Sequence, residues 1–488
     1  MAGIGFQLRL LSRQETISSM VAAMGHAAVI AAGPWLFTIF ALATITALTE
    51  RVAGLPTLAT FRVIVIYAFG ISLLMTAPIT IVTTRRVADA LWGKKPELVG
   101  ELLLGAFMLA VAATGVGVAV LCVVFRLAAP IALALAATSL LVAMIWVALC
   151  FCGAVRDYKG VTLAFLIGLL VALVGSVTAA VLELGATGMV GGFVVGLTIT
   201  FFGLTSRVLR TFPHPVRNPL VGVRLIIRGM AEFWHLAVGT VFGTAGVWID
   251  KVVFWLSPVG EALEVGLIHA PLYDSSMFLS SLVIIPSLAA FVMKLETEFF
   301  DRYQQYYATI KGHGTIGQID RARQRLASYT LDNLTLITVA QVGIGMVLIL
   351  SAPVIASTLN LQFRQIAILR FGALGAVFQF IFIAGTAILL FFDRRRLYLN
   401  LQMLFFFASA GLTVVSIHMG EDYYGTGYFL ACLIASFTAY ALAASTFRNL
   451  NYLTFIGNNP SVLESTGGRR PMLIGRLIEV LRGPKPKT

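Results

Sequence analysis

The chain has 488 residues, of which 59% are hydrophobic and only 12% are charged, and its mean hydropathy is +0.92. A soluble protein carries roughly 25% charged residues, so this composition excludes a soluble globular protein and predicts an integral membrane protein. The net charge of +13 would suggest nucleic-acid binding in a soluble protein, but here the position of each charge along the chain matters more than the sum.

Twelve apolar runs follow one another along the chain, each close to the roughly 20 residues that a helix needs to cross a bilayer. Short polar breaks separate them, which favours an all-α polytopic membrane protein with about 12 transmembrane helices. The first run is too long for a signal peptide and lacks a small-residue cleavage site, so we expect it to remain as a helix. The runs are residues 20–48, 61–83, 102–124, 127–151, 161–182, 187–205, 236–256, 267–293, 331–353, 366–392, 400–417 and 427–447.

The basic residues are concentrated in alternate breaks. If the N-terminus is cytoplasmic, 29 of the 35 Lys and Arg residues fall in cytoplasmic segments. Such an excess of positive charge on one side is the usual signal for the cytoplasmic face. It predicts a multi-pass protein with both termini in the cytoplasm, and it explains the basic charge without any nucleic-acid partner.

The runs divide into two sets of six around a basic, proline-rich segment. We expect a six-helix lobe at 1–205, a linker at 206–235 that contains an amphipathic helix at the membrane interface, and a second six-helix lobe at 236–450. A basic cytoplasmic tail follows at 451–488. A further cytoplasmic segment, 294–330, lies within the second lobe, and we expect its aromatic residues at the headgroup level or against a partner. Six plus six helices is a transporter layout.

Two ionisable residues, Asp250 and Lys251, lie inside the seventh run, in the stretch GTVFGTAGVWIDKVVFWL. A charged side chain at a helix centre costs about 2.5–3.5 kcal/mol on insertion scales, so each needs a functional or a packing explanation. Asp274, in the next run, is expected at a similar depth, roughly 10 Å from the outer end of its helix. We therefore expect these residues to line a water-filled cavity. The alternative is that Asp250 bonds a polar group on a neighbouring helix while Lys251 extends outward.

Adjacent positions on a helix point about 100° apart, so Asp250 and Lys251 are not expected to face each other. The two residues would then belong to two different surfaces, one narrow and acidic, the other cationic with two indoles. The stripe that contains Asp250 also holds Gly239, Gly243 and Gly246. The face that contains Lys251 also holds Thr240, Thr244, Trp248 and Trp255.

The first run contains the stretch AAGPWLF, in which Gly33 and Pro34 predict a hinge. Proline removes one backbone hydrogen bond and clashes with the preceding turn, and glycine lets the kink form. Trp35 follows at mid-membrane depth. Ordinary packing kinks are the alternative explanation for each proline. Three further prolines are expected to break helices in the same way: Pro78, Pro286 and Pro353.

Glu296 and Glu298 stand where the eighth run enters the segment 294–330. As solvated charges on a helix they need no functional explanation. As part of an inner vestibule they would attract a cationic substrate or organise a partner.

The sequence carries no catalytic motif. It lacks G-x-x-x-x-G-K-[ST], H-E-x-x-H and Ser-His-Asp patterns, which predicts a membrane transporter with no catalytic residue, no metal and no cofactor. The stretch GHGTIG at 312–317 matches G-x-G-x-x-G, but no strand is expected before it, so a flexible turn is the better interpretation. The cysteines all lie in or beside apolar runs, as structural cysteines do. They are Cys122, Cys150, Cys152 and Cys432.

Four stretches carry a family resemblance: MAGIGFQLR at the start, GPWLF in the first run, WIDKVVFWLSP in the seventh, and APLYDSSMFLSSLVIIPSLAAFVMKLETEFFDRYQQYY from 270 to 307. Together they resemble the PelG family, the inner-membrane exporters of the Pel exopolysaccharide system. That family belongs to the multidrug/oligosaccharidyl-lipid/polysaccharide flippase (MOP) superfamily.

The resemblance implies two six-helix lobes around a central cavity, in the bacterial inner membrane. It also implies a galactosamine-rich, partly cationic polysaccharide as the substrate. A cytosolic Pel glycosyltransferase would make this polymer, and a cyclic-di-GMP receptor and an accessory membrane subunit of the synthase complex would be further partners.

On this reading, acidic side chains give the path a negative potential that favours amino sugars, and tryptophans offer flat surfaces to pyranose rings. Lys251 fits a purely anionic path only if it pairs with a carboxylate on another helix. A flippase for lipid-linked oligosaccharide, an ion-coupled multidrug antiporter of the same superfamily and a non-transporting scaffold remain the alternatives. The acidic residues of the hypothesis are Asp250, Asp274, Glu296 and Glu298. Its tryptophans are Trp35, Trp248 and Trp255.

Overall fold

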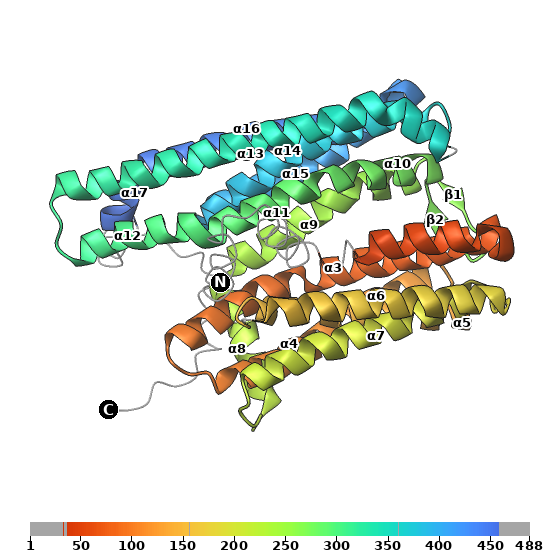
Figure 1. The fold of residues 1–488 in the computed structure, drawn as a ribbon, viewed down its shortest axis with the longest axis horizontal. Helices are drawn as coiled ribbons and strands as arrows, with labels where there is room; N and C mark the ends of the chain where they lie inside the picture. Colours follow the sequence, from red (N-terminus) through yellow and green to blue (C-terminus); the bar gives the residue numbers. More distant parts are fainter. Residues whose placement is uncertain (1–32, 34–36, 156, 360, 458–488) are drawn as a thin grey trace.

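The protein is an all-α polytopic membrane protein. A computed structural model describes residues 33, 37–155, 157–359 and 361–457. Within these residues, eleven helices are long and apolar enough to cross a membrane. Figure 1 shows them in two groups, which we call the first bundle (37–53 and α3–α8) and the second bundle (α9–α17).

The first bundle begins with a helical stretch at 37–53. The helices that follow it are α3 (Leu55–Trp92), α4 (Leu98–Val124), α5 (Ala129–Cys152), α6 (Tyr158–Val181), α7 (Gly185–Thr211) and α8 (Pro219–Glu232).

The second bundle begins with α9 (Trp234–Trp255) and a small hairpin, β1 (Glu261–Ala262) and β2 (Ile268–His269). A segmented helix follows: α10 (Pro271–Ser281), a 3-10 turn (Leu282–Ile284), α11 (Ile285–Lys294), a π-helical turn (Leu295–Phe299) and α12 (Phe300–Lys311). The last helices are α13 (Ile316–Thr358), α14 (Gln365–Phe391), α15 (Arg395–Met419), α16 (Thr426–Arg448) and α17 (Leu450–Tyr452).

The observed helices coincide with the predicted apolar runs, but several are longer. The helix α13 begins at Ile316, well before the predicted run at 331–353. The predicted turn at 312–317 supplies its start, because Thr315 and Gln318 form a reciprocal capping box. Of the first predicted run, 20–48, residues 20–32 and 34–36 lie outside the described part of the chain.

Only one of the described prolines divides its helix. Pro286 follows the 3-10 turn at Leu282–Ile284 and stands in the first turn of α11. The expectation that Pro78 and Pro353 break their helices is wrong, because each lies inside a continuous helix. Neighbouring helices and local backbone adjustment hold such a helix together at the proline.

The predicted amphipathic helix of the linker is present as α8. The Asn218 side chain accepts a hydrogen bond from the amide of Leu220, and Pro219 occupies the first turn. Its apolar face packs closely on α4, since a side chain at Gly222 would collide with the carbonyl oxygen of Glu101. The helix therefore belongs to the first bundle and connects it directly to α9.

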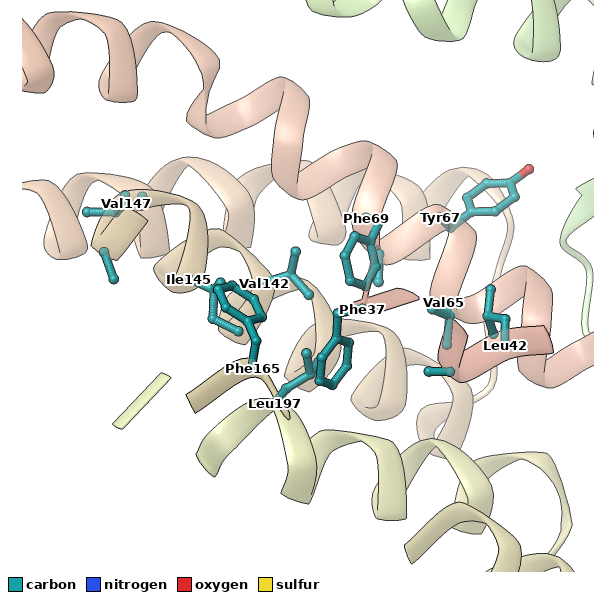
Figure 2. Packing of buried hydrophobic residues seen from close by; sticks show 14 of the residues in the cluster. Phe37, Leu42, Val65, Tyr67, Phe69, Val142, Ile145, Val147, Phe165 and Leu197 are labelled. Atoms are coloured by element: carbon teal, nitrogen blue, oxygen red, sulfur yellow. The ribbon is translucent and has the colours of Figure 1, made fainter. Parts of the chain in front are cut away.

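The first bundle has an aromatic core. Phe37 makes edge contacts with Phe165 and Phe193, at centroid distances of 6.5 and 5.6 Å. Figure 2 shows Phe37 on the same side of the cluster as Leu197 and Phe165, near labelled apolar side chains of α3 and α5. Tyr67 differs from these neighbours, because its hydroxyl group is directed away from the cluster.

Two aromatic residues of the segment 294–330, Phe299 and Tyr306, pack inside the chain, which corrects for these two the expectation that they face headgroups or a partner. Phe299 is 2% exposed and contacts Phe391 at a centroid distance of 5.0 Å. Tyr306 is fully buried and donates a 3.0 Å hydrogen bond to Asn451. Helices that extend beyond their apolar runs continue to bury apolar area against one another.

Candidate functional site

The helix α9 packs on α15 through its glycine stripe. A Cβ atom at Gly239 would lie 2.7 Å from the ring of Tyr398, and one at Gly246 would lie 2.7 Å from the ring of Phe405. Small residues let two membrane helices approach this closely. The glycine stripe is therefore a packing surface, and the expectation that it forms an acidic face with Asp250 is wrong.

Asp250 and Lys251 bond each other inside the second bundle. The ammonium nitrogen of Lys251 lies 3.1 Å from both carboxylate oxygens of Asp250 and donates to the carbonyl oxygen of Val247. Tyr273 of α10 donates a 2.8 Å hydrogen bond to the same carboxylate. The lysine also lies 5.7 Å from the ring centroid of Tyr428 on α16. The Asp250 side chain is fully buried.

This pairing corrects the expectation that Asp250 and Lys251 do not face each other. The argument from helix faces holds for Cβ directions, but the four-carbon stem of lysine lets its ammonium group turn back toward the preceding residue. Lys251 therefore finds its carboxylate on its own helix and not on another one. A buried charge that is paired and hydrogen-bonded in this way is tolerated in a low-dielectric interior.

Asp274 stands in the first turn of α10, next to the end of α9. Its Oδ2 atom accepts hydrogen bonds from the indole N–H of Trp255, at 2.8 Å, and from the amide of Ala270, at 3.0 Å. Its Oδ1 atom is buried and has no hydrogen-bond partner among the described residues. The structure thus brings Asp274 and Trp255 together, and Tyr273 connects them to the pair of Asp250 and Lys251.

Two of the tryptophans of α9, Trp248 and Trp255, contact residues of α3 in the first bundle. The ring of Trp248 lies over Gly70, where an added Cβ would be 3.2 Å from the indole. The indole of Trp255 stacks on the ring of Tyr67 with a centroid distance of 4.8 Å and an angle of 14°. The boundary between the bundles is therefore aromatic at this level.

Tyr67 is the residue of this site that the sequence did not indicate. It is one aromatic side chain in a long apolar run, and nothing in the spacing of that run marks it. Its hydroxyl group donates a 2.7 Å hydrogen bond to the carbonyl oxygen of Ile268 in β2. Its ring also makes an edge contact with Phe125, at 5.8 Å.

The hairpin of β1 and β2 lies over this site. Its strands pair antiparallel, with Glu261 opposite His269. The turn contains Gly266 with a φ of 87°, a conformation that favours glycine. Burial lowers the pKa of His269 below its ordinary value of 6.5; Glu261 opposes this shift and Arg62 adds to it.

The remaining predicted residues lie elsewhere or outside the described part. Trp35 and Pro34 are not among the described residues. Gly33 packs against the ring of Phe165, where a Cβ would be 3.0 Å away. Glu298 pairs with Lys294 at 3.0 Å and with Arg302 at 3.5 Å. It lies about 36 Å along the helix from Asp274 at 1.5 Å per residue, so the two carboxylates do not form one cluster.

The side chain of Glu296 is outside the described part, and its backbone belongs to the π-helical turn at Leu295–Phe299. Among the described residues, no group of three His, Cys, Asp or Glu side chains is placed to hold a metal ion. Cys150 and Cys152 are unpaired thiols of α5, and Cys152 is buried.

Comparison with known proteins identifies the family. The family described as "PelG: Putative exopolysaccharide Exporter (EPS-E)" matches residues 1–455. A search of curated proteins found no match.

Solved structures show the fold. An outward-facing multidrug resistance MATE family transporter of the MOP superfamily aligns with a TM-score of 0.58 and 15% identity, over 87% of this chain and 96% of its own. A MATE protein in the straight conformation aligns with a TM-score of 0.59 and 13% identity over the same shares. A MOP superfamily transporter from Pyrococcus furiosus, described as having a binding pocket of reverse polarity, aligns with a TM-score of 0.57 and 14% identity, again over 87% and 96%. The chain belongs to the PelG family of exopolysaccharide exporters, and its fold is that of the MOP superfamily transporters.

Proposed function

We propose that this protein moves the galactosamine-rich, partly cationic exopolysaccharide of the Pel system across the bacterial inner membrane. The family and the fold both point to a transporter. The observation that carries the proposal further is the cluster of Trp248, Trp255 and Asp274 at the boundary between the two bundles. In a two-bundle transporter the substrate passes at that boundary.

The proposed path combines flat aromatic surfaces with one carboxylate. Trp255 presents an indole face toward the first bundle and Trp248 contacts that bundle with its indole ring, and aromatic faces suit pyranose rings. Asp274 adds negative charge beside one of them, which favours a sugar that carries an amine. Asp250 contributes little potential to this path, because Lys251 neutralises it inside the second bundle.

Glu298 belongs to the segment 294–330, one of the Lys- and Arg-rich segments that we place in the cytoplasm. We call the end of the molecule with these segments the basic end, and we place both termini there. Because Lys294 and Arg302 bond it, its role there is to position basic groups, and it adds little net negative charge. A cytosolic glycosyltransferase would deliver the polymer at this end, with a cyclic-di-GMP receptor and an accessory membrane subunit as further partners.

The test is reconstitution of the chain with its candidate synthase partners in inverted membrane vesicles. We expect polymer inside the vesicles, protected from added glycosidase, only when this chain is present. Trp255→Ala should reduce the protected polymer about 2- to 10-fold, the range for loss of one aromatic contact. Trp92→Ala is the matched control, because Trp92 is 86% exposed at the basic end.

Three outcomes would contradict the proposal as a whole, and a fourth would contradict its acidic path alone. Equal amounts of protected polymer with and without the chain would remove its role in export. Transport of a lipid-linked oligosaccharide without a glycosyltransferase would favour the flippase. Movement of a fluorescent cation against a proton or sodium gradient would favour the antiporter. Full export by Asp274→Asn at normal protein levels would contradict the acidic part of the path.

A further inference from the structure

We propose that Trp255 and Asp274 form an amino-sugar subsite, and that Tyr67 occupies the aromatic surface of this subsite when no sugar is bound. The proposal rests on the proposed function for its substrate class. It adds the residue that competes with the substrate and the carboxylate oxygen that receives the amine.

The indole face of Trp255, the aromatic surface of the subsite, is covered by the ring of Tyr67. Trp255 is 9% exposed, and one face of its indole lies under the ring of Tyr67, nearly parallel and 4.8 Å away. A pyranose ring stacked on this face would need the volume that the tyrosine ring fills. The sugar and the Tyr67 ring therefore exclude each other, and binding requires that Tyr67 leave.

The Asp274 carboxylate is held in place, and only one of its two oxygen atoms has hydrogen-bond donors among the described residues. Its Oδ2 atom accepts from Trp255 and from the amide of Ala270, so the group is held beside the indole. Its Oδ1 atom is buried without a donor among the described residues. A buried carboxylate oxygen without a donor is costly, and an ammonium group would supply a strong charge-assisted hydrogen bond.

The nearby lysine does not supply that donor. The ammonium group of Lys251 is bonded to Asp250 and to the carbonyl oxygen of Val247. The free oxygen of Asp274 is thus available to a ligand, and the ligand that fits is a ring bearing a primary amine. This is the chemistry of a 2-amino sugar, and an N-acetylated ring would lack the positive charge.

Tyr67 is held by contacts that break together. Its hydroxyl group donates to the carbonyl oxygen of Ile268 in the hairpin, and its ring stacks on Trp255. These two partners belong to the second bundle, while Tyr67 and its edge contact Phe125 belong to the first. When the ring leaves, the subsite opens and the contacts that Tyr67 makes with the second bundle are lost.

The experiment measures binding of a galactosamine tetramer and of its N-acetylated form to the purified full-length protein in nanodiscs. Tyr67→Ala should bind the galactosamine tetramer about 5- to 100-fold more tightly than the natural protein, because the competing stack and hydrogen bond are gone. Tyr67→Phe loses only the hydrogen bond and should gain about 2- to 10-fold. A tyrosine that merely supports the fold would give no gain in either variant.

The other variants test the two halves of the subsite. Trp255→Ala should lose most of the binding. Asp274→Asn should bind the two tetramers with similar affinity, whereas the natural protein should prefer the free amine. Tyr423→Ala is the matched control, because Tyr423 is 46% exposed at the same end of the molecule, and its affinity should be unchanged.

Unchanged or weaker binding of the galactosamine tetramer by Tyr67→Ala and Tyr67→Phe would overturn the proposal. If the alanine variant fails to fold, the affinity of Tyr67→Phe alone tests the proposal. A preference for the free amine that persists in Asp274→Asn would overturn the role of the carboxylate. Vesicle export by the natural chain without these binding changes would reject the subsite alone. Binding as described without any vesicle export would reject the proposed function alone.

Discussion

Replacing Lys251 with methionine would leave the Asp250 carboxylate buried without its counter-charge. That side chain is fully buried, and besides the lysine its only donor among the described residues is the hydroxyl group of Tyr273. Removing one partner of a buried ion pair costs about 3–5 kcal/mol of unfolding free energy. Asp250→Asn should cost a similar amount, because it strands the ammonium group instead.

The double variant Asp250→Asn/Lys251→Met should recover most of this loss. Replacing both partners of a buried pair by neutral side chains is often neutral or stabilising, and an amide oxygen at position 250 still accepts from Tyr273. The cycle should therefore show a coupling energy of about 2–3 kcal/mol between the two positions.

The assay is reversible denaturant unfolding of the purified protein in mixed micelles, for the natural chain, both single variants and the double variant. Lys294→Met is the matched control, because its pair with Glu298 is exposed at 35% and 46%, and it should cost under about 1 kcal/mol. A loss below about 1 kcal/mol for Lys251→Met, or a double variant no more stable than the worse single variant, would refute the reasoning. A stable double variant that has lost export would place Asp250 in the path after all.

Three further changes test the packing and the hairpin by the same unfolding assay. Gly246→Leu should cost about 1–3 kcal/mol, because the new side chain meets the ring of Phe405; Gly343→Ala, with no atom within 4 Å, should change little. Gln341→Leu should stabilise the protein by about 1–3 kcal/mol, since both polar atoms of this buried side chain have no partner among the described residues. Because burial lowers the pKa of His269, the unfolded state binds the extra proton below pH 6.5; stability should fall as the pH drops below that value, and His269→Gln should reduce the fall.

The sequence predicts the helices well because one physical requirement dominates them. A segment in hydrocarbon must satisfy its own backbone hydrogen bonds, so a long apolar run becomes a helix. Hydropathy does not show where a helix ends beyond its apolar run, and α3 and α13 both continue into polar sequence. The amphipathic α8 was predictable because arginines and apolar residues alternate at helical spacing.

The candidate site was predictable only in part. Asp274 and Trp255 both stand out in the sequence, and the structure places them in contact. The pairing of Lys251 with Asp250 was missed because an argument from helix faces ignores the reach of a flexible side chain. Tyr67 could not be found, because its partners come from the other bundle and leave no trace in the spacing of its own helix.

The buried ion pair and the proposed subsite are joined by two consecutive residues of α10. Tyr273 bonds Asp250 in the bundle interior, and Asp274 bonds Trp255 at the bundle boundary. We infer that the pair of Asp250 and Lys251 holds the first turn of α10 through Tyr273 and thereby helps to position the Asp274 carboxylate. On this inference the two ionisable groups of α9 have a positioning role.

Tyr273→Phe tests that connection, because it removes one hydrogen bond and leaves the ion pair intact. We expect the preference for the galactosamine tetramer over its N-acetylated form to fall about 2- to 10-fold, the value of one hydrogen bond. Tyr428→Phe is the matched control, since that ring lies over Lys251 from α16 and donates to no residue of α10 among the described hydrogen bonds. An unchanged preference in Tyr273→Phe would mean that the Asp274 carboxylate is held by Trp255 and the α10 backbone alone.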